Sequence, residues 1–86
     1  MDEIIIKLTP HERDLLLEDS FIDPVLIQRL KIAEVKGNHL IVKYSPQELE
    51  ELIGYIAAEA NHTDNKNIEK SLDRLCDKLS DILDDF

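Results

Sequence analysis

The chain has 86 residues, of which 43% are hydrophobic and 34% charged, with only two glycines and three prolines. This length and composition exclude a disordered or fibrous chain and predict one domain, residues 1–86, that buries roughly 60% of the unfolded chain's surface. The formal net charge of −9 argues against direct nucleic-acid binding, which depends on neutralising phosphates with Lys and Arg.

The negative charge is concentrated in the C-terminal half. Residues 1–45 carry six Lys/Arg and eight Asp/Glu, whereas residues 46–86 carry four and eleven. An acidic surface of this kind attracts basic proteins. A single cysteine, acidic residues near the N-terminus and no apolar run of about 20 residues together predict a cytoplasmic chain without a membrane segment.

The first predicted elements are a strand and a helix. Ile4, Ile6 and Leu8 alternate with Ile5 and Lys7, which predicts a strand buried on at least one face. The sequence Thr-Pro-His-Glu at 9–12 then has the residue pattern of a capping box with proline at the first helical position. We expect a helix of about ten residues from there, with the leucines at 15–17 as its apolar face.

A second helix and a hairpin turn follow. Asp23-Pro24 repeats the helix-start signal, and Ile27, Leu30 and Ile32, extended toward Val35, have near-helical spacing. This helix should end near residue 33. The Gly-Asn pair at 37–38 predicts a tight hairpin turn with positive φ at the glycine.

The second half begins with the same pattern. Residues 40–44 alternate as a strand, and Ser45, Pro46 and Glu48 form a second capping box. The helix that follows should end near His62 and place one apolar stripe inward. Gly54 and the nearby alanines predict close approach of a neighbouring helix. The stripe consists of Leu49, Leu52, Ile53, Ile56, Ala57 and Ala60.

The last helix should begin near Asp64 or Asn65 and carries a heptad-like seam. The seam extends for less than three heptads, so it favours packing within the chain over a coiled coil. A homodimer through this C-terminal helix is the alternative. The seam consists of Ile68, Leu72, Leu75, Leu79, Ile82 and Phe86.

The two halves resemble each other. Residues 4–17 and 40–53 align without a gap at an offset of 36 and share the order strand, hydroxyl, proline, glutamate, helix. The sequence therefore predicts an α+β fold of two β-α-α units, 1–38 and 39–86, with a small antiparallel sheet of two or three strands packed against four helices. Internal duplication explains the match, and independent use of the same helix-start signal is the alternative.

The sequence contains few candidate catalytic or metal-binding residues. Glu59 and His62 form one Glu-x-x-His pair, the spacing used in di-iron bundles, which need two such pairs and further glutamates. A histidine that compensates the end of the helix explains His62 equally. His11 and His39 have no metal-ligand spacing with Cys76. We predict no catalytic, cofactor-binding or metal residues.

The segment SPQELEELIGYIAAEANHTDNKNIEKSLDRLCDKLSDIL resembles short uncharacterised bacterial proteins of the domain-of-unknown-function kind. The resemblance is best in LIGYIAAEANHT and weaker in TPHERDLLLED. It implies no activity or functional residue. It draws attention to Glu59, Asn61 and His62 as interaction residues, or simply as the corner between two helices.

The sequence thus favours a small acidic, non-enzymatic protein-interaction or regulatory module. The partner would be a protein, and the chain itself could form dimers. An alternative is an antitoxin-like or nucleic-acid-mimicking protein that neutralises a basic partner. A more distant alternative is a small metal-dependent enzyme that uses Glu59 and His62.

Overall fold

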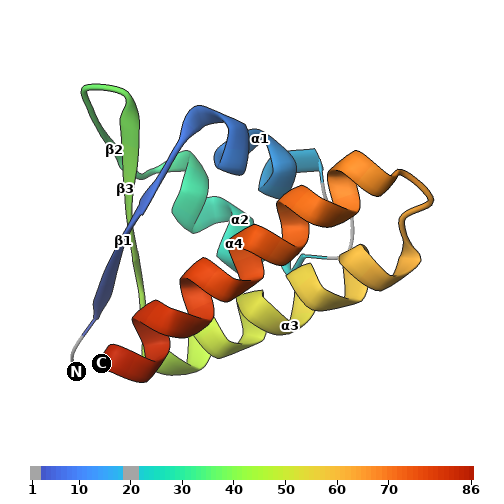
Figure 1. Ribbon diagram of the computed structural model, residues 1–86. Coiled ribbons are helices and arrows are strands. Elements are labelled where there is room, and N and C mark those ends of the chain that lie inside the picture. Colours follow the sequence, from blue (N-terminus) through green and yellow to red (C-terminus); the bar gives the residue numbers. More distant parts are fainter. Residues whose placement is uncertain (1–2, 19–21) are drawn as a thin grey trace.

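The elements follow one another in the predicted order. The computed structural model describes residues 3–18 and 22–86 (Figure 1). The elements are β1 (Ile4–Leu8), α1 (Pro10–Glu18), α2 (Pro24–Lys31), β2 (Glu34–Lys36), β3 (His39–Tyr44), α3 (Pro46–His62) and α4 (Lys66–Asp85). The predicted α+β class, with a small antiparallel sheet and four helices, is confirmed.

The sheet is antiparallel, with strand order β1-β3-β2. Ile6 pairs with Val42 at the centre of the β1–β3 register. These two residues also match each other at the sequence offset of 36, so the strand pair is symmetric about this position. This symmetry concerns the strand pair alone, and the duplication of the two units stays a prediction.

The turn between β2 and β3 has the predicted chemistry. Gly37 and Asn38 form a two-residue connection, and Gly37 has φ of 59°. Residues with a Cβ rarely adopt this left-handed conformation, so glycine suits the position. The hairpin thereby adds the short third strand at one edge of the sheet.

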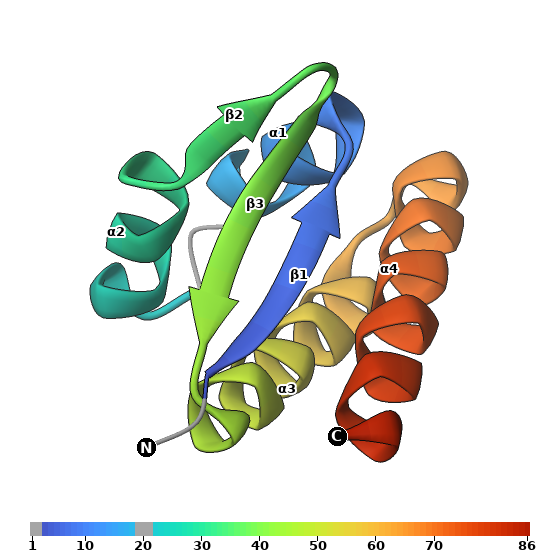
Figure 2. The ribbon, with the colours of Figure 1, turned by 90° about the vertical axis from the view of Figure 1, so that its left-hand side faces the viewer.

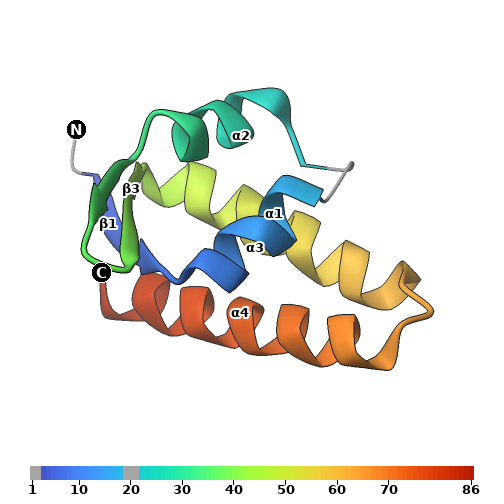
Figure 3. The same ribbon diagram turned by 90° about the horizontal axis from the view of Figure 1, so that it is seen from above.

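One face of the sheet forms the core. The inward-facing side chains of β1 and β3 are at most 7% exposed, and all four helices lie on this side (Figures 1 and 3). The opposite face is turned toward the viewer in Figure 2 and no helix lies in front of it. The inward residues are Ile4, Ile6, Leu8, Leu40, Val42 and Tyr44.

Both predicted capping boxes form. At the start of α1, the amide of Thr9 donates to Glu12 Oε1 at 2.8 Å and the amide of Glu12 donates to Thr9 Oγ1 at 3.1 Å. At the start of α3, Ser45 and Glu48 make the same two bonds at 2.9 and 3.1 Å. Each pair satisfies two amides that a helix start leaves without backbone partners.

Most of the apolar seam of α4 is buried against other elements of the same chain. Leu72, Leu75 and Leu79 are at most 1% exposed, and α4 runs antiparallel to α3 along its length (Figures 1 and 3). Only the ends of the seam are open, with Ile68 36% and Phe86 60% exposed. The seam leucines are therefore occupied within the chain, and a homodimer through the C-terminal helix stays a prediction.

Several expected core positions are exposed. Leu17, Ile32 and Val35 are 43%, 69% and 67% exposed. Among the leucines of α1, Leu16 alone is fully buried, because a helix of nine residues presents one narrow arc to the core. Ile32 lies beyond the last residue of α2, and Val35 lies on the edge strand.

The expected role of Gly54 is also wrong. Gly54 is exposed, and a Cβ built there would meet no atom within 4 Å. It lies two residues from both Leu52 and Ile56, which is about 200° around the helix from the buried stripe. The glycine therefore faces away from neighbouring helices.

Candidate protein interaction surface

The outward face of α4 carries a row of carboxylates, which we call the acidic stripe. Asp73, Asp77, Asp81 and Asp84 are exposed and recur at spacings of four, four and three. The first three each lie two residues from a buried leucine of the seam, so they point away from the core. Successive carboxylates are about 4.5–6 Å apart along the helix axis.

The acidic stripe opposes the stability of its own helix. The C-terminus of a helix carries partial negative charge, yet the last turn of α4 has no basic residue. Aspartates four apart on one face also repel each other. None of the ion pairs between described residues includes an aspartate of the stripe. These carboxylates therefore contribute charge to the surface rather than stability to the fold.

Lys78 lies between the aspartates of the stripe in sequence, but its ammonium group contacts α1 and β1 instead of these carboxylates. Lys78 Nζ lies 2.8 Å from Glu12 Oε1 and 2.7 Å from the backbone oxygen of Lys7. Partial burial raises the pKa of Glu12, but the hydrogen bond and charge of Lys78, with the bonds to Thr9, outweigh it and the net pKa lies below the ordinary 4.5. Lys78 thus holds α4 to β1 and α1.

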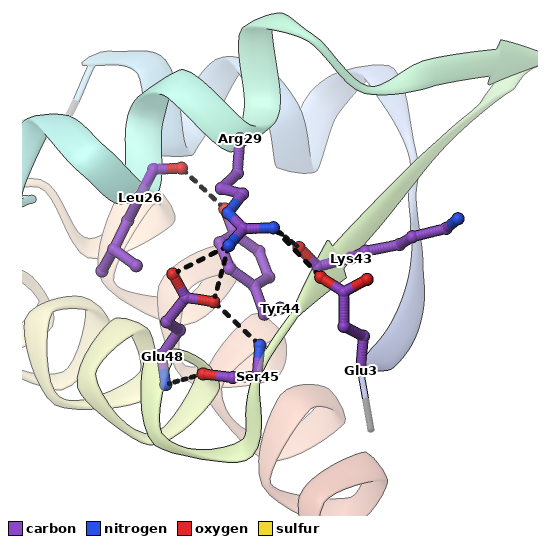
Figure 4. Close-up of polar contacts among 7 residues, drawn as sticks. All are labelled: Glu3, Leu26, Arg29, Lys43, Tyr44, Ser45 and Glu48. Atoms are coloured by element: carbon purple, nitrogen blue, oxygen red, sulfur yellow. Dashed lines mark hydrogen bonds and ion pairs between the residues drawn. The ribbon is translucent and has the colours of Figure 1, made fainter. Parts of the chain in front are cut away.

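Arg29 makes a corresponding contact at the opposite end of the β1–β3 strand pair (Figure 4). Its guanidinium lies 3.1 Å from Glu3 Oε2, 3.3 Å from Glu48 Oε1 and 3.5 Å from the backbone oxygen of Lys43. Glu48 belongs to the second capping box, as Glu12 belongs to the first. Each box is therefore held by a cation from a helix of the other unit.

A buried tyrosine lies beside this arginine. The hydroxyl of Tyr44 donates to the backbone oxygen of Leu26 at 2.9 Å and joins β3 to α2 (Figure 4). Burial, together with the charge of Glu48, raises the pKa of Tyr44 well above its usual range. Tyr44 is therefore a neutral structural donor. The sequence pattern placed it on the inward face but gave no sign of its partner.

The three residues singled out at the α3–α4 corner all lie at the C-terminal end of α3. Glu59 is half-buried, with Oε2 buried and without a hydrogen-bond partner. Asn61 and His62 are exposed, and His62 lies in the last turn of α3. Within residues 3–18 and 22–86, no group of three or more His, Cys, Asp or Glu is placed to hold a metal ion.

The surroundings of Cys76 and His11 point to structural rather than catalytic roles. Partial burial, reinforced by Asp77 and Asp73, raises the pKa of the Cys76 thiol, and the Ser80 hydroxyl opposes this only in part. A thiol of raised pKa is a weak nucleophile. His11 Nε2 lies 3.4 Å from Ser71 Oγ, so it links α1 to α4.

A second surface lies between α2 and the sheet. A depression of about 240 Å³ is lined by Ile32, Ala33, Ile41 and the Arg29–Glu3 pair, among others. A shallower one of about 310 Å³ continues along α2 beside Val25. Val25 and Ile32 are 62% and 69% exposed. This apolar region adjoins the uncovered face of the sheet.

Comparisons with protein-family models, curated proteins and solved structures find no match for this chain. The lack of a match agrees with the resemblance to uncharacterised proteins noted in the sequence, which implied no activity. The described helices contain no segment long and apolar enough to cross a bilayer. Functional inference therefore rests on the surfaces of the molecule itself.

Proposed function

We propose that the chain is a non-enzymatic protein-interaction module that binds a basic protein surface through the acidic stripe of α4. The carrying observation is that Asp73, Asp77, Asp81 and Asp84 stay exposed on one face, where their mutual repulsion disfavours them. The helix dipole adds to this at Asp84, in the last turn. Residues that break a local stability rule without a structural return are candidates for function.

The charge distribution supports an oriented encounter. The uncovered face of the sheet has three lysines, Lys7, Lys36 and Lys43, and one glutamate, in a chain of net charge −9. The strongest negative potential therefore lies over the helices. A basic partner is steered toward α4 and away from the sheet, at a rate that falls with ionic strength.

A more specific form of this function is neutralisation of a nucleic-acid-binding protein, as in antitoxin-like or nucleic-acid-mimicking proteins. The stripe places a carboxylate about every 4.5–6 Å along the helix axis, whereas one DNA strand carries a phosphate about every 3.4 Å. The row is sparser than a phosphate backbone but has the same sign and linear form. This spacing favours a partner that binds phosphates in a row.

The test compares two variants of equal charge. D77N/D81N removes two carboxylates from the stripe, and D14N/E18Q removes two exposed carboxylates from α1. Wild type and both variants serve as baits in cell extract, and captured proteins are quantified by mass spectrometry. A basic protein retained by wild type and D14N/E18Q but reduced about tenfold with D77N/D81N is the expected result.

Equal capture by all three baits would contradict the role of the stripe. For the more specific form, the captured protein is assayed for DNA binding with and without the chain. The chain should displace DNA from it, and simultaneous binding of DNA and chain would leave only the general interaction function.

A further inference from the structure

The uncovered face of the sheet carries positive charge in an acidic chain, and we call it the outer sheet face. No described element lies in front of it (Figure 2). It holds three of the chain's 10 Lys/Arg but only one of its 19 Asp/Glu. The sign of its charge is therefore opposite to that of the chain as a whole. The outer sheet face consists of Ile5, Lys7, Glu34, Lys36, His39, Ile41 and Lys43.

The three lysines of this face are not used within the fold. Lys7, Lys36 and Lys43 are exposed, and none of the ion pairs between described residues includes their ammonium groups. Lysines on edge strands protect a sheet against pairing with another chain. Lys43, however, lies on the central strand β3, which has a neighbour on both sides. Edge protection therefore does not explain its position.

Exposed apolar side chains lie between two of these lysines. The register places Lys7 beside Ile41 and Ile5 beside Lys43, so the two isoleucines are diagonal neighbours about 7–8 Å apart. Ile5 is 59% exposed and Ile41 is half-buried. Lys7 and Lys43 occupy the other diagonal. A ligand on this face thus meets apolar surface flanked by ammonium groups.

We propose that the outer sheet face binds an acidic segment of a partner protein in which carboxylates flank an apolar side chain. The apolar side chain packs on Ile5 and Ile41, and the carboxylates pair with Lys7 and Lys43. Charge complementarity carries this choice, because the cations of the face have no carboxylate partners within the described chain.

The single carboxylate of the face favours a peptide over a nucleic acid. Glu34 pairs with Ile41 on the β2 side, so it repels negative charge placed beside the apolar centre. A nucleic-acid strand carries a phosphate on every nucleotide and cannot leave a gap there. A peptide can place an uncharged residue next to Glu34 and keep its carboxylates for the lysines.

The acidic stripe leaves this binding possible at physiological salt. The stripe belongs to α4, in the helical layer behind the sheet (Figures 1 and 2). Exposed charges more than about 8 Å apart are largely screened at physiological ionic strength. An acidic segment on the outer sheet face therefore responds mainly to the lysines of that face.

The inference goes beyond the proposed function, because it concerns a second surface of opposite charge. The stripe variant D77N/D81N should bind an acidic peptide at least as well as wild type does. A variant of the sheet lysines should still capture the basic partner of the stripe. The two proposals can therefore fail separately.

Fluorescence anisotropy with a defined probe tests the inference. The probe is a fluorescein-labelled peptide with a central Leu-Leu pair between two runs of glutamate, and its control has glutamine for each glutamate. Wild type should bind the acidic peptide, more weakly as salt is added, and bind the control about tenfold less tightly. No change in anisotropy up to millimolar protein overturns the proposal. Oligothymidylate bound as tightly as the acidic peptide overturns the choice of a protein segment.

Two variants of equal charge locate the binding site. K7Q/K43Q removes two lysines of the outer sheet face, and K66Q/K70Q removes two exposed lysines of α4. The first should weaken binding of the acidic peptide by about tenfold, the worth of two exposed ion pairs, and the second should change it little. Circular dichroism checks that both are folded. Equal losses in the two variants would mean that only net charge matters, which overturns the proposal.

Glu34→Gln gives a result of opposite sign. Removing the one carboxylate of the face should strengthen binding of the acidic peptide by about two- to fivefold, a gain that damage to the fold cannot produce. Glu50→Gln, at an exposed position of α3, is the matched control and should change binding little. A gain no larger for Glu34→Gln than for Glu50→Gln contradicts binding at this face.

Discussion

Replacing Lys78 by methionine should destabilise the fold although Lys78 lies at the surface. The side chain is 36% exposed, but its partner carboxylate on Glu12 is only 17% exposed. The substitution removes one contact with a half-buried carboxylate and one with the backbone oxygen of Lys7. An exposed ion pair contributes less to stability than a hydrogen bond to a charged group, and these contacts are intermediate between the two. We therefore expect the free energy of unfolding to fall by about 1–2 kcal/mol.

The loss should depend on pH through Glu12. Its folded pKa lies below 4.5, so the unfolded chain takes up the proton first as pH falls. The stabilisation is complete above this ordinary value and declines as pH falls through the folded pKa. The difference in unfolding free energy between wild type and Lys78→Met should therefore be constant near neutrality and shrink below about pH 4.5.

Urea unfolding followed by circular dichroism measures these differences. Lys70→Met, an exposed lysine on the same helix, controls for loss of one positive charge. Glu12→Gln completes a double-mutant cycle, since glutamine can still accept the bond from the Thr9 amide. The reasoning is refuted if Lys78→Met and Lys70→Met unfold alike, or if the Lys78–Glu12 coupling energy is zero at neutral pH.

Three further substitutions test the backbone and the core. Gly54→Ala should stabilise the protein by about 1 kcal/mol and raise its melting temperature, because the glycine is exposed within a helix and a Cβ meets nothing. Gly37→Ala should cost about 1–2 kcal/mol in urea unfolding, because φ is 59° there. Tyr44→Phe should cost about 1–2 kcal/mol by removing the buried hydrogen bond from the Tyr44 hydroxyl to the backbone oxygen of Leu26. An unchanged midpoint in any of these variants would contradict the stated contact or conformation.

The helix starts and strand faces were predictable because local chemistry specifies them. Thr9 with Glu12, and Ser45 with Glu48, satisfy backbone groups within three residues of one another, so the pattern is complete in the sequence. The alternation of β1 and β3 likewise identifies their buried faces. The α4 seam and its opposite acidic stripe follow from helical periodicity alone.

The exposure of Ile32 and Val35 was not predictable in this way. Periodicity says which residues share a face but not whether another element covers that face. α2 ends at Lys31 and β2 is an edge strand of three residues, so apolar side chains beyond these limits remain open. The candidate surface between α2 and the sheet exists for this reason.

By itself, the sequence determined the element order, the helix starts, the inward faces and the net charge, because each depends on neighbouring residues or on composition. Only the tertiary structure decided which cations are used within the fold. Lys78 is 66 residues from Glu12, and Arg29 is 19 residues from Glu48, distances along the chain at which no local pattern links two side chains. Packing brings these charges together and leaves the aspartates of the α4 stripe exposed.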